Sequence, residues 1–341
     1  VIDGEEIPFK TNILFQEKGD SRRTFGIEIC EDLWCTYPPS SDLTIRGAKV
    51  IFNLSASNEI IGKSEYRKSL IKSQSEKTIS AYVYASSGIN ESTTDLVFSG
   101  ASFIYENGHL LSKNNRFDFE SNLIFNDVDL ARIDAMRVKD ISYMGVIKDR
   151  DKKYDIAYFD GYAPDNELIR KYTPSPFVPS SLSNRNERCE EILNIQANAL
   201  AKRMKSTGIK RAVIGISGGL DSTLALLVCT MAFKNLGYDN KDIIAITMPC
   251  FGTTSRTKNN ALGLMNELNV TSYDIDITES VKVQFKDIGQ NENVHDVTYE
   301  NVQARTRTEI LMNKANQVGG LVIGTGDLSE VALGWSTYNG D

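Results

Sequence analysis

Residues 211–223 read RAVIGISGGLDST, an apolar run followed by a glycine-rich loop, an aspartate and two hydroxyl residues. The run AVIGI is predicted to be a buried strand, and the residues after the glycines are predicted to begin a helix. Backbone N–H groups freed by Gly215, Gly218 and Gly219 converge on an anion in such a turn, and the dipole of the following helix favours negative charge. The stretch therefore predicts an α/β fold with a phosphate-binding loop.

Strands and helices alternate from about residue 186 onward. The segment 186–208 is amphipathic, and short apolar runs at 212–216, 243–249, 273–277 and 321–325 are separated by helical patterns. Such alternation predicts a parallel sheet covered on both faces, with ligands at the carboxyl ends of its strands.

The first part of the chain has a different pattern. Residues 23–128 are rich in β-type runs, including RTFGIEIC, KVIFNLSAS and AYVYASSG, and the run ASFIYENGHLLS turns at Asn107-Gly108. A probable helical pattern of mixed charge, 62–80, separates two of these runs. We expect a mixed sheet with helices packed on it.

Composition narrows the class of protein. The 341 residues suggest about two domains. A formal charge of −7 without a long basic run argues against a nucleic-acid partner, and no apolar stretch is long enough for a membrane span. Five scattered cysteines indicate a reduced, cytoplasmic protein. With only two histidines, a Ser-His or Cys-His mechanism has few sources for its base.

The expected organisation has three parts. Residues 1–140 form the C-terminal portion of a first domain, 141–185 a linker, and 186–341 a second domain truncated at its C-terminus. Four of the eight prolines fall in the linker, where each removes a backbone donor. Because the chain starts without methionine and stops directly after WSTYNGD, we expect an internal portion of a longer polypeptide.

The carboxylate of Asp221 restricts the chemistry of the glycine loop. The loop lacks the lysine of a GxxxxGK[ST] cradle and does not fit a GxGxxG fingerprint. A carboxylate beside polyphosphate is repelled unless a cation lies between them, so Asp221 is predicted to bind Mg²⁺. The alternative is a tight strand-to-helix turn capped by Ser217 or Asp221.

SGGLDS resembles the pyrophosphate loop of the N-type ATP pyrophosphatases, and DVTYENVQARTRTEILMNKANQ, GTGDLSE and ALGWSTY resemble NAD synthetases in order and spacing. The resemblance implies a Rossmann-like adenine nucleotide α-hydrolase domain. It implies a magnesium site at Asp221 and Glu330. It implies that ATP is bound by Gly215, Ile216, Ser217, Gly218, Gly219, Leu220, Asp221, Ser222 and Thr325. It also implies that deamido-NAD is bound by Asn301, Arg305, Glu330, Trp335, Ser336, Thr337 and Tyr338.

GIEICEDLW resembles the nucleophile elbow of the nitrilase superfamily, and the downstream runs NLSAS and AYVYASSGINESTTDLVFSG match its glutamine amidases. This implies a truncated αββα amidase domain in which Cys30 is the nucleophile. Glu31, Ser57 and Lys63 would bind glutamine, although the family has arginine where Lys63 stands. No residue before Cys30 matches the family's glutamate and lysine. The alternative for Cys30 is a buried small hydrophobe.

Together the two resemblances imply a ligase that amidates deamido-NAD with ATP, Mg²⁺ and ammonia from glutamine. They also imply a homo-oligomer built on dimers of the second domain. Two alternatives stay open, another amidotransferase of the pyrophosphatase group and a non-catalytic ATP-binding module.

Overall fold

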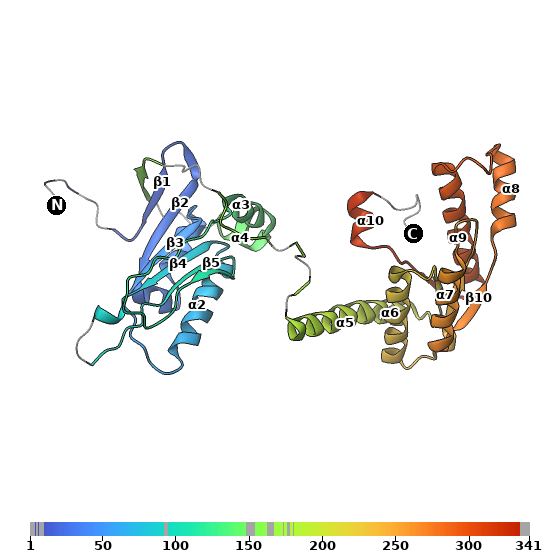
Figure 1. Cartoon of the computed structure of the whole chain (residues 1–341), viewed down its shortest axis with the longest axis horizontal. Coiled ribbons are helices and arrows are strands. Elements are labelled where there is room, and N and C mark those ends of the chain that lie inside the picture. The colour runs from blue at the N-terminus through green and yellow to red at the C-terminus, as the bar shows by residue number, and fades with distance from the viewer. Residues whose placement is uncertain are drawn as a thin grey trace. The chain divides into compact units, whose positions relative to one another are not determined.

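The computed structural model describes residues 4, 6, 10–91, 95–147, 154–161, 167–172, 174–175, 178–179 and 181–334 (Figure 1). The chain divides into two compact units, Val1–Pro174 and Ser175–Asp341. The division falls within the segment predicted as a linker, and the predicted domain boundaries stay a prediction. Each unit is α/β, as expected from the sequence.

The described residues of the first unit form one mixed sheet in the order β6-β5-β4-β3-β2-β1-β7. Strands β2, β3 and β4 are parallel neighbours, and β7 pairs in parallel with β1. Because β7 lies inside the segment predicted as a linker, part of that segment belongs to the first unit. The strands are β1 (Ile13–Glu17), β2 (Asp20–Ile29), β3 (Val50–Ser55), β4 (Ala81–Ser86), β5 (Ser102–Glu106), β6 (His109–Lys113) and β7 (Asp155–Phe159).

Helices cover one face of this sheet. Leu43 and Ile71 from two of them pack against Ile51 and Tyr82 of the sheet in one buried cluster. The helices of the unit are α1 (Pro39–Ile45), α2 (Lys63–Lys77), α3 (Leu130–Lys139) and α4 (Ile141–Ile147).

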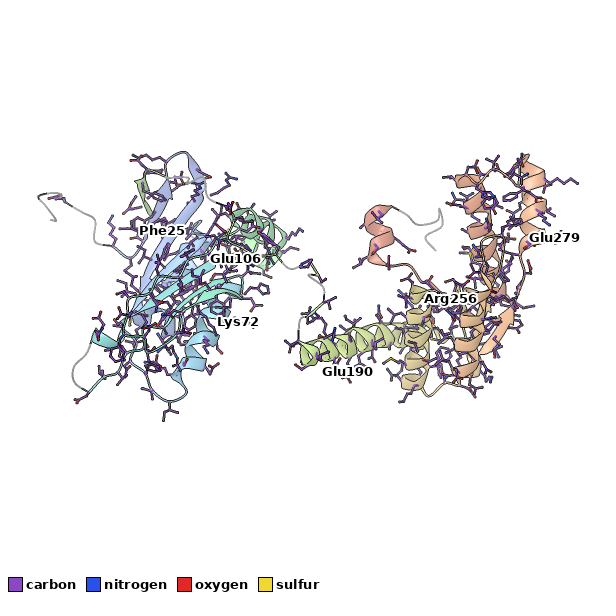
Figure 2. All side chains as sticks on the ribbon, in the orientation of Figure 1. Phe25, Lys72, Glu106, Glu190, Arg256 and Glu279 are labelled. Carbon is purple, nitrogen blue, oxygen red and sulfur yellow. The ribbon has the colours of Figure 1, made fainter. Side chains whose placement is uncertain are left out.

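The opposite face of the sheet is apolar and exposed. Ile29 of β2 and Leu54 of β3 are register partners and are 62% and 57% exposed. Nearby, Phe25 (Figure 2) stacks on Phe15 and meets Phe52 edge-on, with ring centroids 5.0 and 5.3 Å apart. The described residues thus supply one β-layer with helices on one side, and the second β-layer of the predicted αββα sandwich is not among them.

The second unit has a parallel sheet in the order β10-β9-β8-β11. Its strands are β8 (Ala212–Gly215), β9 (Ile243–Thr247), β10 (Thr271–Asp274) and β11 (Leu321–Ile323). The helices are α5 (Leu182–Thr207), α6 (Leu220–Leu236), α7 (Ser255–Glu267), α8 (Thr278–Ile288), α9 (Val297–Val318) and α10 (Leu328–Leu333).

Successive residues of β8 face different cores in this unit. Ile214 packs with Leu226 and Phe233 of α6, whereas Val213 belongs to a second cluster that includes Phe285 of α8. Because side chains alternate along a strand, the two clusters lie on opposite faces of the sheet. The parallel sheet covered on both faces, predicted from the sequence, is confirmed.

Two expectations from composition concern cysteines and membranes. All five cysteines are free thiols, and Cys229 and Cys250 are buried. Burial raises the pKa of the Cys229 thiol to about 12, so it stays protonated. Within the described ranges, no helix has the length and apolar character needed to cross a membrane.

A buried ion pair ties residues 167–172 to β5. Arg170 donates from Nη1 and Nη2 to the two carboxylate oxygens of Glu106 (Figure 2) at 2.7 and 2.8 Å. The two side chains are 8% and 2% exposed. Asp127 Oδ2 accepts the N–H groups of Ile169 and Arg170 at 2.6 and 2.9 Å, so the same segment is held at its backbone.

Replacing this arginine tests its contribution to the first unit. Arg170→Met leaves the buried Glu106 carboxylate with the Asp129 N–H at 2.8 Å but without a cation, and we expect a loss of about 3 kcal/mol in the free energy of unfolding. Urea unfolding is followed by Trp34 fluorescence in a Trp335→Phe background. The exposed Arg22–Asp20 pair is the control, and Arg22→Met should leave the urea midpoint unchanged. Equal midpoints for the two variants would contradict the assignment.

Candidate functional site

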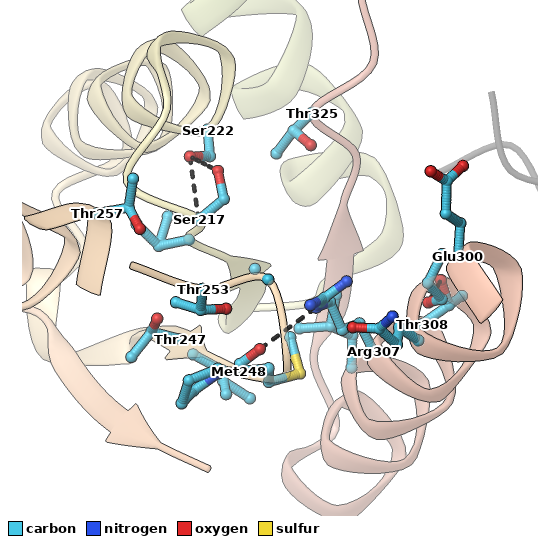
Figure 3. A pocket seen from close by; sticks show the side chains of 18 of the residues that line it. Ser217, Ser222, Thr247, Met248, Thr253, Thr257, Glu300, Arg307, Thr308 and Thr325 are labelled. Carbon is cyan, nitrogen blue, oxygen red and sulfur yellow. Dashed lines mark hydrogen bonds between the residues drawn. The ribbon is translucent and has the colours of Figure 1, made fainter. Parts of the chain in front are cut away.

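A cavity of about 630 Å³ lies at the carboxyl ends of β8 and β9 in the second unit. Figure 3 shows Ser217 and Ser222 of the glycine loop on one side and Arg307 of α9 on another. Thr325, after β11, also lines it. The remaining lining residues are Gly215, Ile216, Ile246, Thr247, Met248, Pro249, Gly252, Thr253, Thr257, Tyr299, Glu300, Gln303, Ala304, Thr308 and Leu311.

Hydrogen bonds within the glycine loop set its shape. Ser217 N donates to Ser222 Oγ at 3.3 Å, and Gly219 N donates to Ser217 Oγ at 3.2 Å. The Ser222 hydroxyl donates in turn to the Gly219 carbonyl at 3.3 Å. The N–H of Gly219 is therefore hydrogen-bonded within the loop. The sequence had predicted that it faces an anion together with the N–H groups of Gly215 and Gly218.

The first turn of α6 offers further donors. Gly219 is the N-cap, and no side chain of the described residues caps the helix there. The N–H groups of Leu220 and Asp221 open the helix and have no intrahelical acceptor. These N–H groups, the adjacent hydroxyls and the helix dipole suit a phosphate group.

Backbone conformation and packing both require glycine at position 218. Its φ is +84°, a conformation that residues with a Cβ rarely adopt. A Cβ at this position would also overlap the carbonyl oxygen of Thr257 in α7. The glycine therefore allows the loop and α7 to approach closely at the edge of the cavity.

One face of α9 forms a wall of the cavity. Glu300, Gln303, Arg307 and Leu311 recur at helical spacing along it. Arg307 Nε donates to the Met248 carbonyl at 3.3 Å, and burial lowers the pKa of its guanidinium (Figure 3). This bond holds a cationic group in the cavity wall.

Sequence reasoning selected different residues of α9. Asn301 and Arg305 are not among the residues that line the cavity, and Arg305 is exposed. Arg307 was not among the residues that the sequence predicted to bind a ligand. The helical spacing of Glu300, Gln303 and Arg307 shows that they share one face of α9. The sequence does not show that this face lines a cavity.

The two predicted magnesium ligands lie at helix starts. Asp221 is exposed in the first turn of α6. Glu330 completes a capping box on α10, where its Oε2 accepts from Asp327 N at 3.1 Å and its own N donates to Asp327 Oδ1 at 2.8 Å. Neither residue lines the cavity. Trp335, Ser336, Thr337 and Tyr338 lie outside the described residues.

Cys30 occupies a strained turn in the first unit. It follows β2 and begins a short 3-10 helix, Cys30–Trp34, with a φ of +50°. Left-handed backbone costs a non-glycine residue about 1–2 kcal/mol and is concentrated at functional sites. Ile29 N donates to Asp32 Oδ2 at 2.8 Å, which holds the turn from one side. The geometry is that of an elbow presenting one side chain at a strand end.

The predicted glutamine-binding residues lie on nearby elements. Ser57 is buried and accepts a hydrogen bond from Arg67 Nη2 at 3.4 Å. Lys63 Nζ donates to Asn58 at 3.0 Å and lies 5.4 Å from the centroid of the Trp34 ring. Glu31 is exposed in the first turn of the 3-10 helix.

Arg67 was missed from the sequence. Its side chain is fully buried and pairs with Glu59 at 2.7 Å. An arginine was expected at position 63, whereas the guanidinium that contacts Ser57 comes from the next turn of α2. The sequence signal, an arginine one helical turn before Ile71, is also typical of a buried structural ion pair.

Comparison with known proteins places these sites in context. Residues 192–341 match the NAD synthase family. The chain is 41% identical to a glutamine-dependent NAD(+) synthetase of Mycobacterium bovis, over 99% of this chain and 51% of the relative. The corresponding protein of Mycobacterium leprae is 39% identical, over 97% of this chain and 50% of the relative. The chain spans about half the length of the curated relatives it matches.

A solved structure of glutamine-dependent NAD+ synthetase from Acinetobacter baumannii, in complex with adenosine diphosphate, is also similar. It is 23% identical, covers 96% of this chain and 52% of its own, and has a TM-score of 0.42.

The role of Gly218 can be tested against its neighbour. Gly218→Ala forces a left-handed alanine into the carbonyl of Thr257, and we expect a loss of about 2 kcal/mol or more in the free energy of unfolding of the second unit. Gly219→Ala is the matched control, since its added Cβ would lie 3.3 Å from the flexible Ser217 side chain. Thermal unfolding by circular dichroism measures both, and equal melting temperatures would contradict the packing role.

Strain at Cys30 predicts an unusual order of stabilities. Cys30→Gly should be more stable than Cys30→Ala by about 1 kcal/mol, because glycine adopts a φ of +50° without steric cost. Urea unfolding followed by Trp34 fluorescence compares the two. If alanine is as stable as glycine, the backbone at this position is not strained.

Proposed function

We propose that the chain is part of a glutamine-dependent NAD(+) synthetase, because residues 192–341 match the NAD synthase family. In this proposal, the second unit amidates deamido-NAD at the expense of ATP and releases AMP and pyrophosphate. The first unit supplies ammonia from glutamine. The similarity to glutamine-dependent relatives over 99% of the chain, and not only over the family match, supports including the first unit.

The observation that carries the proposal is the composition of the cavity in the second unit. The glycine loop, the end of β9, the residue after β11 and one face of α9 all contribute to it. Hydroxyl and N–H donors lie at the start of α6, and the cationic Arg307 lies in the wall formed by α9. A nucleotide triphosphate and an anionic co-substrate both require such donors.

The reaction needs no covalent bond between the protein and phosphorus. The nicotinate carboxylate of deamido-NAD attacks the α-phosphorus of ATP, pyrophosphate leaves, and an adenylate forms. Ammonia then attacks the activated carbonyl, loses a proton, and displaces AMP to give the amide. The protein contributes positioning and charge complementarity, through Ser217, Ser222, Thr325 and Arg307.

The assignment of deamido-NAD contacts stays a proposal. Asn301, Arg305, Glu330 and residues 335–338 are the positions that the family resemblance implies. Arg307 joins them because its guanidinium faces the cavity. The location in the cytoplasm and the pairing of second units into dimers are proposed on the resemblance and composition alone.

Magnesium is proposed as the cofactor. The carboxylate of Asp221 accepts none of the hydrogen bonds or ion pairs found among the described residues, and it stands in the helix turn that offers N–H groups to phosphate. Glu330 uses one oxygen in its capping box and keeps the other available. Carboxylate oxygens are suitable ligands for Mg²⁺, which would neutralise phosphate charge when bound.

Cys30 is the proposed nucleophile of the glutamine reaction. Its sulfur attacks the carboxamide carbon of glutamine and forms a thioester, and the proton that the thiol gives up passes to the leaving nitrogen, so that ammonia is released. Water then hydrolyses the thioester to glutamate and restores the thiol. The strained elbow supports this assignment, as does Lys63, which lies 5.4 Å from the ring centroid of Trp34 in the 3-10 helix that Cys30 begins.

Pyrophosphate release tests the synthetase reaction. With ATP, Mg²⁺, ammonium and deamido-NAD, we expect release that Asp221→Asn lowers at least about a hundredfold, because the metal loses a ligand. Asp287→Asn, on the exposed side of α8, is the control and should keep the parent rate. Equal release with xanthylate or aspartate would indicate another pyrophosphatase. Unchanged release in Asp221→Asn would contradict the metal role.

A further inference from the structure

A buried polar cluster lies beside the Cys30 elbow, on the helix-covered face of the first sheet. Glu28, Asn53 and Tyr82 are 2%, 0% and 0% exposed. Glu28 and Asn53 are register partners on β2 and β3, and Tyr82 lies on the next strand. Polar groups placed against an apolar core cost stability unless they are hydrogen-bonded, so their arrangement needs a reason.

The three side chains form a continuous hydrogen-bonded chain that ends on Cys30. The Tyr82 hydroxyl donates to Glu28 Oε1. Asn53 Nδ2 donates to the Tyr82 hydroxyl at 3.1 Å and to the Cys30 carbonyl at 3.4 Å. The amide of Asn53 therefore connects the buried Glu28–Tyr82 pair to the backbone of the elbow.

Two further hydrogen bonds fix the orientation of the Glu28 and Asn53 side chains. Glu28 Oε2 accepts from Ser40 N at 2.7 Å, and Asn53 Oδ1 accepts from Ser55 Oγ at 2.8 Å. Asn53 has its acceptor and both donors engaged, and flipping its amide would place its oxygen against the Cys30 carbonyl, which can only accept. Burial raises the pKa of Tyr82, and its hydroxyl remains a donor to Glu28.

We propose that Glu28, Tyr82 and Asn53 are positioning residues that hold the Cys30 peptide in its left-handed conformation and thereby aim the thiol. This inference rests on the proposed role of Cys30 as nucleophile. Asn53 holds the elbow at the Cys30 carbonyl, while Asp32 holds it at the Ile29 N–H. A strained residue persists only where surrounding contacts determine its conformation, and these are two such contacts.

The chain contains a matched control for Tyr82. Tyr84 lies two residues further along β4, is also 0% exposed, and its hydroxyl has no hydrogen-bond partner among the described residues. Tyr84→Phe thus removes a buried hydroxyl from the same strand without touching the chain of bonds. Tyr82→Phe removes the link between Asn53 and Glu28, and Asn53→Ala removes the contact with Cys30.

The test is the alkylation rate of Cys30 by iodoacetamide between pH 6 and pH 10, followed by mass spectrometry that resolves Cys30 from Cys35. We expect the limiting rate at high pH to fall at least fivefold in Tyr82→Phe and Asn53→Ala and to stay within twofold of the parent in Tyr84→Phe. Circular dichroism melting verifies that each variant is folded. If Asn53→Ala is unfolded, Asn53→Ser takes its place. Limiting rates within twofold of the parent in all folded variants would overturn the proposal.

A second reagent separates this inference from the proposed function. A chloroketone analogue of glutamine should alkylate Cys30 of the parent, and free glutamine should protect it. In Tyr82→Phe, we expect the maximal inactivation rate to fall while the concentration for half-maximal rate changes less than twofold. A parent that the chloroketone does not label at Cys30 contradicts the nucleophile, whereas the iodoacetamide comparison still decides whether the cluster positions the thiol.

Discussion

Parallel pairing of β8 with β9 and β11 is the constraint on which the second unit depends. In a parallel sheet all strands end at one edge, so the loops that follow them meet there. One cavity is lined by the glycine loop, the segment after β9 and Thr325. The first and last of its lining residues, Gly215 and Thr325, are more than 100 positions apart in the chain. The two apolar clusters on either face of the sheet hold this edge in place.

Packing alone explains the glycine at position 218 of the loop. Gly218 adopts a left-handed conformation and lies against the backbone of α7, so the glycine requirement exists even without a ligand. Ser217 and Ser222 bond to the loop itself, which leaves the first turn of α6 as a source of donors for an anion. A preformed loop of this kind loses little conformational entropy when a phosphate binds.

The first unit combines an apolar exposed face with a polar buried cluster. Ile29 and Leu54 expose apolar surface on one side, while Glu28 and Asn53, their sequence neighbours, form hydrogen bonds on the other. Alternation along β2 therefore places Glu28 in the buried face directly before the turn that carries Cys30. The same strand supplies the proposed nucleophile and part of its support.

The local sequence determined the elements. Apolar periodicity and glycine placement predicted the parallel sheet of the second unit, and SGGLDS and ICEDLW selected the loops that are proposed to carry the sites, because these signals depend on residues close together in the chain. Which side chains face a cavity was decided by tertiary structure. Arg307 rather than Arg305 lines the cavity, Arg67 reaches Ser57, and Asn53 reaches Cys30, since each depends on how separate elements pack and on a register that no short stretch contains.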